Sequence, residues 1–115
     1  MGVIISATDK MQSCIDACQK CTQACYECFS VSLNEPDLHM RKTYVSMLIE
    51  CAMMCQISAA TMSMSGKFSK EHCALCAEIC EKCALECDIF KNSHCQKCVE
   101  VCRICAEECK KMAAM

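Results

Sequence analysis

Glycine, proline and tryptophan are nearly missing from this sequence, which has two glycines, one proline and no tryptophan in 115 residues. Most tight turns depend on glycine and proline, so a fold built from many β-hairpins is excluded. Aromatic residues make up only 4% of the chain, so the large side chains that usually fill a core are also scarce. The composition therefore predicts one domain, residues 1–115, made of long helices and short loops.

A strong charge of either sign and a long apolar run are also missing. Twelve Lys and Arg residues oppose 14 Asp and Glu residues, and the two signs are interspersed. A nucleic-acid partner would require a basic stripe, and a membrane helix would require about 18 apolar residues in succession, so we expect neither partner. The N-terminus lacks the basic start and the apolar segment of a secretory signal, so we expect a cytoplasmic protein.

Cysteine is the residue in excess, at 17 of 115 positions. A secreted scaffold linked by disulfides is one explanation for such a count. The count is odd, however, and neighbouring positions on a single helix have poor geometry for a disulfide. We therefore expect free thiols that a reducing cytosol maintains.

The cysteines are spaced in alternating steps of three and four residues, which places them on one stripe of an α-helix. Three segments carry five cysteines each in this spacing, and a fourth segment carries two. We predict helices at about residues 7–33, 37–64, 69–91 and 93–112. The three five-cysteine stripes are Cys14, Cys18, Cys21, Cys25 and Cys28, then Cys73, Cys76, Cys80, Cys83 and Cys87, then Cys95, Cys98, Cys102, Cys105 and Cys109, and the fourth stripe is Tyr44, Leu48, Cys51, Cys55, Ser58 and Met62.

The segments between these helices are short, so neighbouring helices must run antiparallel. The sequence thus predicts an all-α fold, an antiparallel up-down-up-down four-helix bundle with a cysteine-lined core. Ser6, Ser69 and Ser93 are predicted to cap the starts of three helices, and Gln96 completes a capping box with Ser93. Aligned in this way, the stripes form about five layers. The first layer is Cys14, Met62, Cys73 and Cys109, and the last is Cys28, Leu48, Cys87 and Cys95.

Small thiols alone would leave this core underpacked, because truncating a large core side chain costs about 2–5 kcal/mol where a cavity remains. Metal ions would fill the space, and soft thiolates favour Cu(I), zinc and iron–sulfur clusters. One Cu(I) per thiolate leaves the core neutral, whereas zinc with four thiolates buries a double negative charge at each site. We therefore predict multiple Cu(I) ions per chain, with a zinc or general soft-metal buffer as the alternative.

An iron–sulfur redox protein is less favoured, because the ferredoxin spacing C-x2-C-x2-C-x3-C-P does not occur. Zinc fingers place paired cysteines on turns rather than along a helical stripe. No nucleophile is recognisable beside a base and an orienting group, so we expect that the protein is not an enzyme. The sequence thus favours storage or sequestration of Cu(I).

The cysteine pattern of residues 73–87 and 94–109 resembles that of the bacterial copper storage proteins. It is most similar to their cytosolic branch, which lacks an export signal. The resemblance extends over essentially the whole chain and implies a homotetramer of four-helix bundles, each holding Cu(I) inside through cysteine thiolates. The second helix departs from the pattern, because Tyr44, Leu48 and Ser58 take inward positions.

We predict that the metal ligands are all 17 cysteines together with Met62 and His72. Met62 takes an inward position, and a thioether binds Cu(I) weakly. His72 and His94 each precede a cysteine near an end of the bundle, and of the two we select His72, which shares its end with Met11, Met62 and Met112. Such soft, exchangeable ligands favour this end as the place where copper enters.

From residue 52 to residue 65 the second helix carries no charged side chain. A surface helix normally has a polar outer face, and an apolar outer face marks an interface. We therefore expect a homo-oligomer, with a tetramer favoured, that assembles through this helix. A copper donor or acceptor protein is a further partner that the sequence does not identify. The stripe expected to face outward is Met47, Met54, Ile57, Thr61 and Met64.

Overall fold

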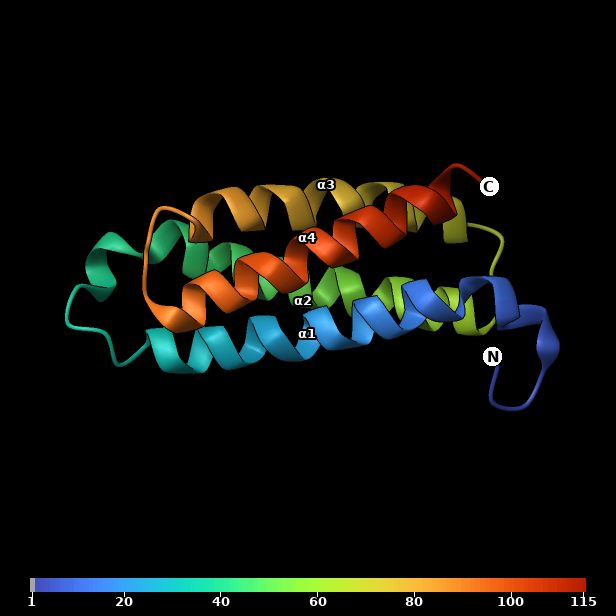
Figure 1. Ribbon diagram of the computed structural model, residues 1–115, viewed down its shortest axis with the longest axis horizontal. Helices are drawn as coiled ribbons and strands as arrows, with labels where there is room; N and C mark the ends of the chain where they lie inside the picture. Colours follow the sequence, from blue (N-terminus) through green and yellow to red (C-terminus); the bar gives the residue numbers. More distant parts are fainter. Residues whose placement is uncertain (1) are drawn as a thin grey trace.

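Four long α-helices form the bundle in the computed structural model, which describes residues 2–115 (Figure 1). No residue in this range forms a β-strand. The predicted all-α four-helix bundle is therefore confirmed. The elements are η1 (Ser6–Met11, a 3-10 helix), α1 (Gln12–Ser32), η2 (Leu38–Met40, a 3-10 helix), α2 (Lys42–Ser63), α3 (Ser69–Cys87) and α4 (Ser93–Ala113).

The helices run alternately up and down and contact one another in a ring, α1 with α2, α2 with α3, α3 with α4 and α4 with α1 (Figure 1). The molecule measures 47 × 23 × 18 Å, so the ring encloses one long axis. The two chain termini lie at one end beside the α2–α3 loop, and the α1–α2 and α3–α4 loops lie at the other. We call these the Met62 end and the Arg41 end, after a residue buried at each.

The inward stripe of each helix consists largely of cysteine, and all 17 cysteines are buried. Large side chains join the stripe only toward its ends, Met62 at one and Leu48 and Tyr44 at the other, each at most 1% exposed. Alanines such as Ala52 and Ala77 are buried between the helices, where their small size lets the backbones approach. The helices form as predicted because a 3–4 spacing of apolar side chains drives one face of each helix into a shared core.

Three helix boundaries differ from the prediction. α3 ends at Cys87 rather than at residue 91, because Phe90 turns inward and its ring packs 5.1 Å from that of Tyr44, centroid to centroid. α1 and α2 begin later than predicted, at Gln12 and Lys42, because the expected first turns form η1 and η2. Such 3-10 turns are common where a helix joins a loop.

The predicted capping by Ser6, Ser69 and Ser93 is wrong, because no side chain caps a helix at these positions. The Ser69 hydroxyl donates to a carbonyl oxygen of the preceding turn at 2.8 Å. Gln96, the other half of the predicted capping box, donates to the Phe90 carbonyl at 2.9 Å. In the turns before α3 and α4 these side chains donate to carbonyl oxygens instead of accepting from the first helical N–H groups.

α2 is the most apolar of the four helices. One 18-residue window has a mean hydropathy of 1.4, so by length and composition alone α2 could cross a membrane. A core helix of a bundle meets the same criteria, and Cys51 and Cys55 of α2 are fully buried. The predicted outward stripe is wrong at Met54, which is only 8% exposed, whereas Met53 is 53% exposed. The reason is that α2 packs against both α1 and α3, which widens its buried face.

α2 terminates in a Schellman motif. The N–H of Gly66 donates to the Thr61 carbonyl at 2.8 Å, and the N–H of Ser65 donates to the Met62 carbonyl at 3.0 Å. Ser65 takes the left-handed conformation, with φ at 51°, in which a side chain is unfavourable. Serine therefore occupies the left-handed position of this motif, where glycine is usually found.

Replacing Ser65 by glycine should raise the free energy of unfolding by about 0.5–1 kcal/mol, because glycine adopts the left-handed conformation without strain. Ser46→Gly is the matched control, since Ser46 is exposed within α2, where glycine is destabilising. Urea unfolding of the reduced proteins, followed by circular dichroism, measures both changes. A Ser65→Gly protein that is less stable than the parent would contradict the interpretation.

Candidate metal centre

Sulfur atoms form a continuous column along the axis of the bundle. All 17 thiols are free, and none is more than 3% exposed. Near the middle, the Sγ of Cys51 in α2 lies 3.6 Å from that of Cys80 in α3, and the Sγ of Cys21 in α1 lies 3.8 Å from that of Cys102 in α4. Cys21 and Cys51 are 4.0 Å apart, so the column joins all four helices and the predicted cysteine-lined core is confirmed.

These separations suit shared metal ions. Two sulfurs bound to one ion by bonds of about 2.3 Å, as in zinc thiolates, lie at most ~4.6 Å apart. The closest sulfurs in the column are already within this limit, at 3.6 to 4.0 Å. Neighbouring thiolates can therefore bind one ion with little movement of the helices.

Groups of cysteines converge closely enough to hold an ion, with sulfurs within 4.8 Å of one another, and neighbouring groups share members. Cys21 and Cys105 each belong to two groups of four, and Cys109 belongs to a group of four and a group of three. When both of its groups are filled, a shared sulfur must bridge two ions, and a thiolate can bridge soft metal ions in this way. The groups are Cys18, Cys76, Cys105 and Cys109; Cys21, Cys55, Cys80 and Cys105; Cys21, Cys25, Cys51 and Cys102; and Cys14, Cys73 and Cys109.

The layers predicted from the sequence form at the Met62 end and are staggered in the middle. In the first layer the sulfurs of Cys14 and Cys109 are 3.6 Å apart. In the middle, aligning the stripes pairs Cys55 with Cys80 and places Cys76 in the next layer, yet the sulfur of Cys55 lies 3.7 Å from both. The sulfurs that belong to two groups lie on α1 and α4, at Cys21, Cys105 and Cys109, so the groups overlap along the column instead of forming isolated squares.

Hydrogen bonds between the thiols shift their pKa values in opposite directions along the column. The pKa of Cys55 is raised above its ordinary value, because it hydrogen-bonds to Cys105 and other thiols and because burial disfavours its thiolate. The pKa of Cys51, one helical turn away, is lowered because neighbouring thiols, Cys102 first among them, donate to its sulfur. A thiolate in the column thus requires protonated neighbours. Metal binding must displace these protons, so affinity falls as the pH falls.

Met62, one of the two non-cysteine ligands predicted, lies inside the column. Its side chain is fully buried, and the Cys73 thiol donates to its Sδ at 3.6 Å. His72, the other predicted ligand, is partly buried nearby, but its ring does not join the group formed by Cys14, Cys73 and Cys109. Its Nδ1 is buried without a hydrogen-bond partner among residues 2–115. The structure thus brings Met62 to the thiols and leaves His72 at their border.

At the Arg41 end, a histidine that the sequence analysis did not select joins the thiols. A ring nitrogen of His94 and the sulfurs of Cys28 and Cys95 lie within 4.8 Å of one another. The ring also approaches the Glu35 carboxylate at 3.7 Å. The sequence did indicate that His94 could lie near the thiols, because it directly precedes Cys95. The neighbour of an inward cysteine lies about 100° around the helix, however, and the sequence does not show whether such a side chain turns inward.

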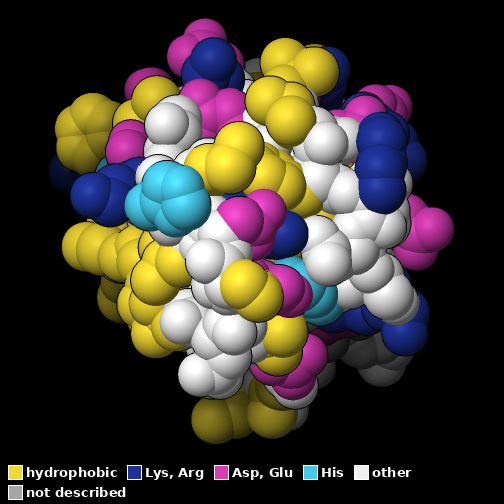
Figure 2. Space-filling view, turned by 90° about the vertical axis from the view of Figure 1, so that its left-hand side faces the viewer, with side chains coloured by type: hydrophobic (Ala, Val, Ile, Leu, Met, Phe, Trp, Pro, Cys, Tyr) yellow, Lys and Arg dark blue, Asp and Glu magenta, His cyan; other side chains and the backbone are white. Residues whose placement is uncertain are grey.

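Arg41 is buried at the same end, with 4% of its surface exposed, and the sequence analysis missed it. Its Nε pairs with Asp37 Oδ1 at 2.6 Å, and an NH2 group donates to Asn92 Oδ1 at 2.8 Å. Its Cζ lies 4.4 Å from the centroid of the Phe90 ring. One side chain thus ties the α1–α2 loop to the α3–α4 loop. Figure 2 views this end and shows apolar side chains interspersed with basic, acidic and histidine side chains.

Tyr44 connects Arg41 to the sulfur column. Its hydroxyl lies 2.6 Å from Ser32 Oγ and accepts hydrogen bonds from Arg41 at 3.1 Å and from the Cys95 thiol at 3.5 Å. Arg41 also donates to Cys95 Sγ at 3.7 Å. Burial raises the pKa of Tyr44 to about 12, so the hydroxyl stays neutral. Tyr44 and Leu48, which the sequence placed at inward positions, are therefore accompanied at this end by a buried cation.

The sequence matches the family model described as copper storage protein over residues 7–114. The chain belongs to the copper storage protein family. The Cu(I)-bound copper storage protein BsCsp3 is 41% identical, with a TM-score of 0.85 and a match that covers 89% of this chain and 96% of that one. A cytosolic copper storage protein from Streptomyces lividans, studied with five coppers, is 29% identical, with a TM-score of 0.90 and coverage of 95% and 96%.

The chain is also similar to a curated protein sequence. The uncharacterized cysteine-rich protein YhjQ of Bacillus subtilis (strain 168) is 42% identical over 76 residues, which cover 66% of this chain and 70% of that one. The family resemblance and the copper storage function predicted from the sequence are therefore confirmed. The thiol column is the part of this family member that is suited to hold its copper.

Replacing Arg41 by methionine should lower the free energy of unfolding by about 1–3 kcal/mol, because the buried oxygens of Tyr44 and Asn92 lose a charged donor. Methionine keeps much of the side-chain volume and so limits the packing loss. Lys42→Met is the control, because Lys42 is exposed and its loss should change stability by no more than ~0.5 kcal/mol. Urea unfolding of the reduced, copper-free proteins measures both, and equal effects would contradict a structural role for Arg41.

Proposed function

We propose that this protein stores Cu(I) in the cytosol and holds many ions per chain in its sulfur column. The observation that carries the proposal is the sharing of sulfurs between neighbouring groups, through Cys21, Cys105 and Cys109. Bridging thiolates let each added ion use ligands that are already in place. The proposed ligands are the sulfurs of all 17 cysteines, with Met62 and His72 at one end and His94 at the other.

Charge supports Cu(I) over zinc as the stored ion. Each zinc with four thiolates would add a double negative charge to a region that excludes water, and such charge is costly without counter-ions. Among residues 2–115, Arg41 is the cation that hydrogen-bonds to a column sulfur, and it does so only at the last layer. One Cu(I) per thiolate requires no counter-ion at all.

Burial of the thiols supports storage rather than catalysis. No thiol is more than 3% exposed, so a substrate has little access to a nucleophilic sulfur. The Streptomyces relative is described as cytosolic, which supports the same location for this chain. A reducing cytosol would keep the thiols free between rounds of loading.

Anaerobic titration of the reduced protein with Cu(I), against a chromophoric chelator, should saturate near one ion per cysteine, or ~15–20 ions per chain by charge matching. Zinc bound by four thiolates should stop at about four ions. Loading should also release about one proton per engaged thiolate, because the thiols are protonated beforehand. Replacing the shared Cys21 and Cys105 by serine should remove more ions than replacing Cys25 and Cys76, which each belong to one group.

Native mass spectrometry counts the ions in each of these variants. A Cu(I) plateau near four ions per chain, or displacement of bound Cu(I) by zinc at equal concentration, would contradict storage in a neutral thiolate column. An equal loss from both double variants would contradict the bridging role of the shared sulfurs.

The outer face of α2 supports assembly into a homo-oligomer, and we favour a tetramer. Ile57 and Met64 of the predicted stripe are 46% and 70% exposed, and Met53 adds a further apolar side chain at 53%. Glu50 is the charged residue on this exposed face between residues 43 and 64. A helix face of this kind in contact with water normally marks an interface.

Replacing Met53 and Ile57 together by lysine should dissociate the oligomer, because two charges would be buried without partners at its centre. Leu85→Lys with Ile104→Lys is the matched control, since these exposed side chains lie on α3 and α4. Light scattering at micromolar concentration measures the mass of each protein. A monomeric parent protein, or dissociation by the control variant alone, would contradict assembly through α2.

A further inference from the structure

Both ends of the sulfur column are covered. At the Arg41 end, Arg41 and Tyr44 lie over Cys95, as described above. At the Met62 end, which the sequence favoured for copper entry, Met62 is fully buried and Met112 is only 5% exposed. Cys73 beneath them has no exposed surface. Cys14 at this end is 3% exposed, so both ends leave little sulfur accessible, and the side walls between the helices offer a further route to the thiols.

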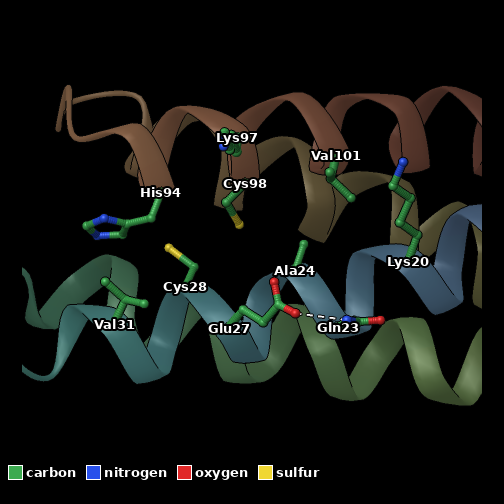
Figure 3. A pocket seen from close by; sticks show the side chains of 10 residues that line it. All are labelled: Lys20, Gln23, Ala24, Glu27, Cys28, Val31, His94, Lys97, Cys98 and Val101. Atoms are coloured by element: carbon green, nitrogen blue, oxygen red, sulfur yellow. Dashed lines mark hydrogen bonds between the residues drawn. The ribbon is translucent and has the colours of Figure 1, made fainter.

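One wall opens into a groove between α1 and α4, with a volume of about 330 Å³ (Figure 3). Cys28 of α1 and Cys98 of α4 form its floor, each 2% exposed. In Figure 3 both sulfurs point into the space between the two helices, with His94 beside Cys28. Ala24 contributes only a methyl group, which keeps the groove open. Three other surface grooves of 290 to 390 Å³ have no cysteine in their walls.

The floor of the groove is continuous with the column. The sulfur of Cys98 lies 3.9 Å from that of Cys102, which lies 3.9 Å from that of Cys25. Cys28 belongs to the group that contains His94. An ion bound at the floor can thus move inward by steps between neighbouring sulfurs, without opening either end.

Two lysines flank the groove, Lys20 on α1 and Lys97 on α4. Neither forms an ion pair within the described residues 2–115. The acidic residue of the wall, Glu27, already accepts a hydrogen bond from the Gln23 amide at 2.8 Å, drawn as a dashed line in Figure 3. The groove therefore presents two unpaired ammonium groups and one carboxylate beside two thiols, and this excess of positive charge attracts an anionic ligand.

We infer that this groove binds a small anionic thiol that carries Cu(I), and that the ion is transferred there to Cys28 and Cys98. The inference rests on the proposed function, since it supplies the route by which the stored ion arrives. Carboxylates of the carrier would contact Lys20 and Lys97 while its copper-bound sulfur faces the floor. A volume of about 330 Å³ suits a small molecule, because ligand pockets of roughly 300–1,000 Å³ hold molecules of that class.

The transfer is an exchange of ligands without oxidation or reduction. The bond between Cu(I) and the carrier sulfur breaks as a bond from Cu(I) to Cys28 Sγ forms. The proton of the Cys28 thiol passes to the departing carrier thiolate, and Cys98 supplies the second sulfur in the same way. Thiolate ligands on both sides suit a soft ion, so the ion never has to be free in water.

The test compares two copper donors of opposite charge, Cu(I)–glutathione, which bears carboxylates, and Cu(I)–cysteamine, which bears ammonium groups. In Lys20→Gln with Lys97→Gln, anaerobic stopped-flow loading from Cu(I)–glutathione should slow by about 10-fold, the lower limit of electrostatic steering. Loading from Cu(I)–cysteamine should not slow. Lys10→Gln with Lys67→Gln removes the same charge at the Met62 end and should change neither rate.

A second variant tests the groove without changing charge. Ala24→Leu narrows the groove with a good helix former and should slow loading from both donors, with final capacity unchanged by native mass spectrometry. The inference is overturned if Ala24→Leu loads at the parent rate, or if the Lys20 and Lys97 variant slows with both donors or with neither. It is also overturned if the control at the Met62 end slows instead. A parent protein that holds few ions would contradict the proposed function itself, which the capacity measurement shows independently of the rates.

Discussion

The size of the cysteine side chain is the constraint on which this bundle depends. A seam of large apolar residues fills a four-helix core by itself, whereas a seam of thiols brings sulfur atoms to 3.6–4.0 Å and leaves little apolar bulk between them. The column is therefore held by weak contacts among neutral groups. Each thiol becomes a strong ligand when it loses its proton. The same small thiols that pack weakly therefore allow the core to bind soft cations.

The ends of the bundle supply the packing that the column does not. At the Arg41 end, the stacked Phe90, Arg41 and Tyr44 side chains link two loops that the helices alone would leave apart. At the other end, Met62 fills the bore and still offers its sulfur to Cys73. The large side chains that stabilise the bundle thus lie at its ends, and most of the metal ligands lie between them.

The repeating part of the fold could be predicted from the sequence, and the ends could not. A 3–4 spacing is a local property, so it located the helices, their inward faces and the sulfur column without tertiary information. The inward turn of Phe90, which ends α3 at Cys87, depends on Arg41 from a distant loop. The burial of Met54 likewise depends on how far α1 and α3 wrap around α2. His94 was missed for the same reason, since its orientation is set by the loop before α4.

Sulfurs that lie between two successive levels of the column affect how ions share it. Had the layers been flush, four thiols at each level would have formed separate sites with independent affinities. Cys55 instead lies at the same distance, 3.7 Å, from cysteines of two successive levels. An ion that binds at one level displaces the proton from a sulfur that the next level also uses. The free-energy cost of burying that thiolate is therefore incurred only once. Affinity in such a column belongs to the network of sulfurs, and a single cysteine contributes to it through the neighbours that it bridges.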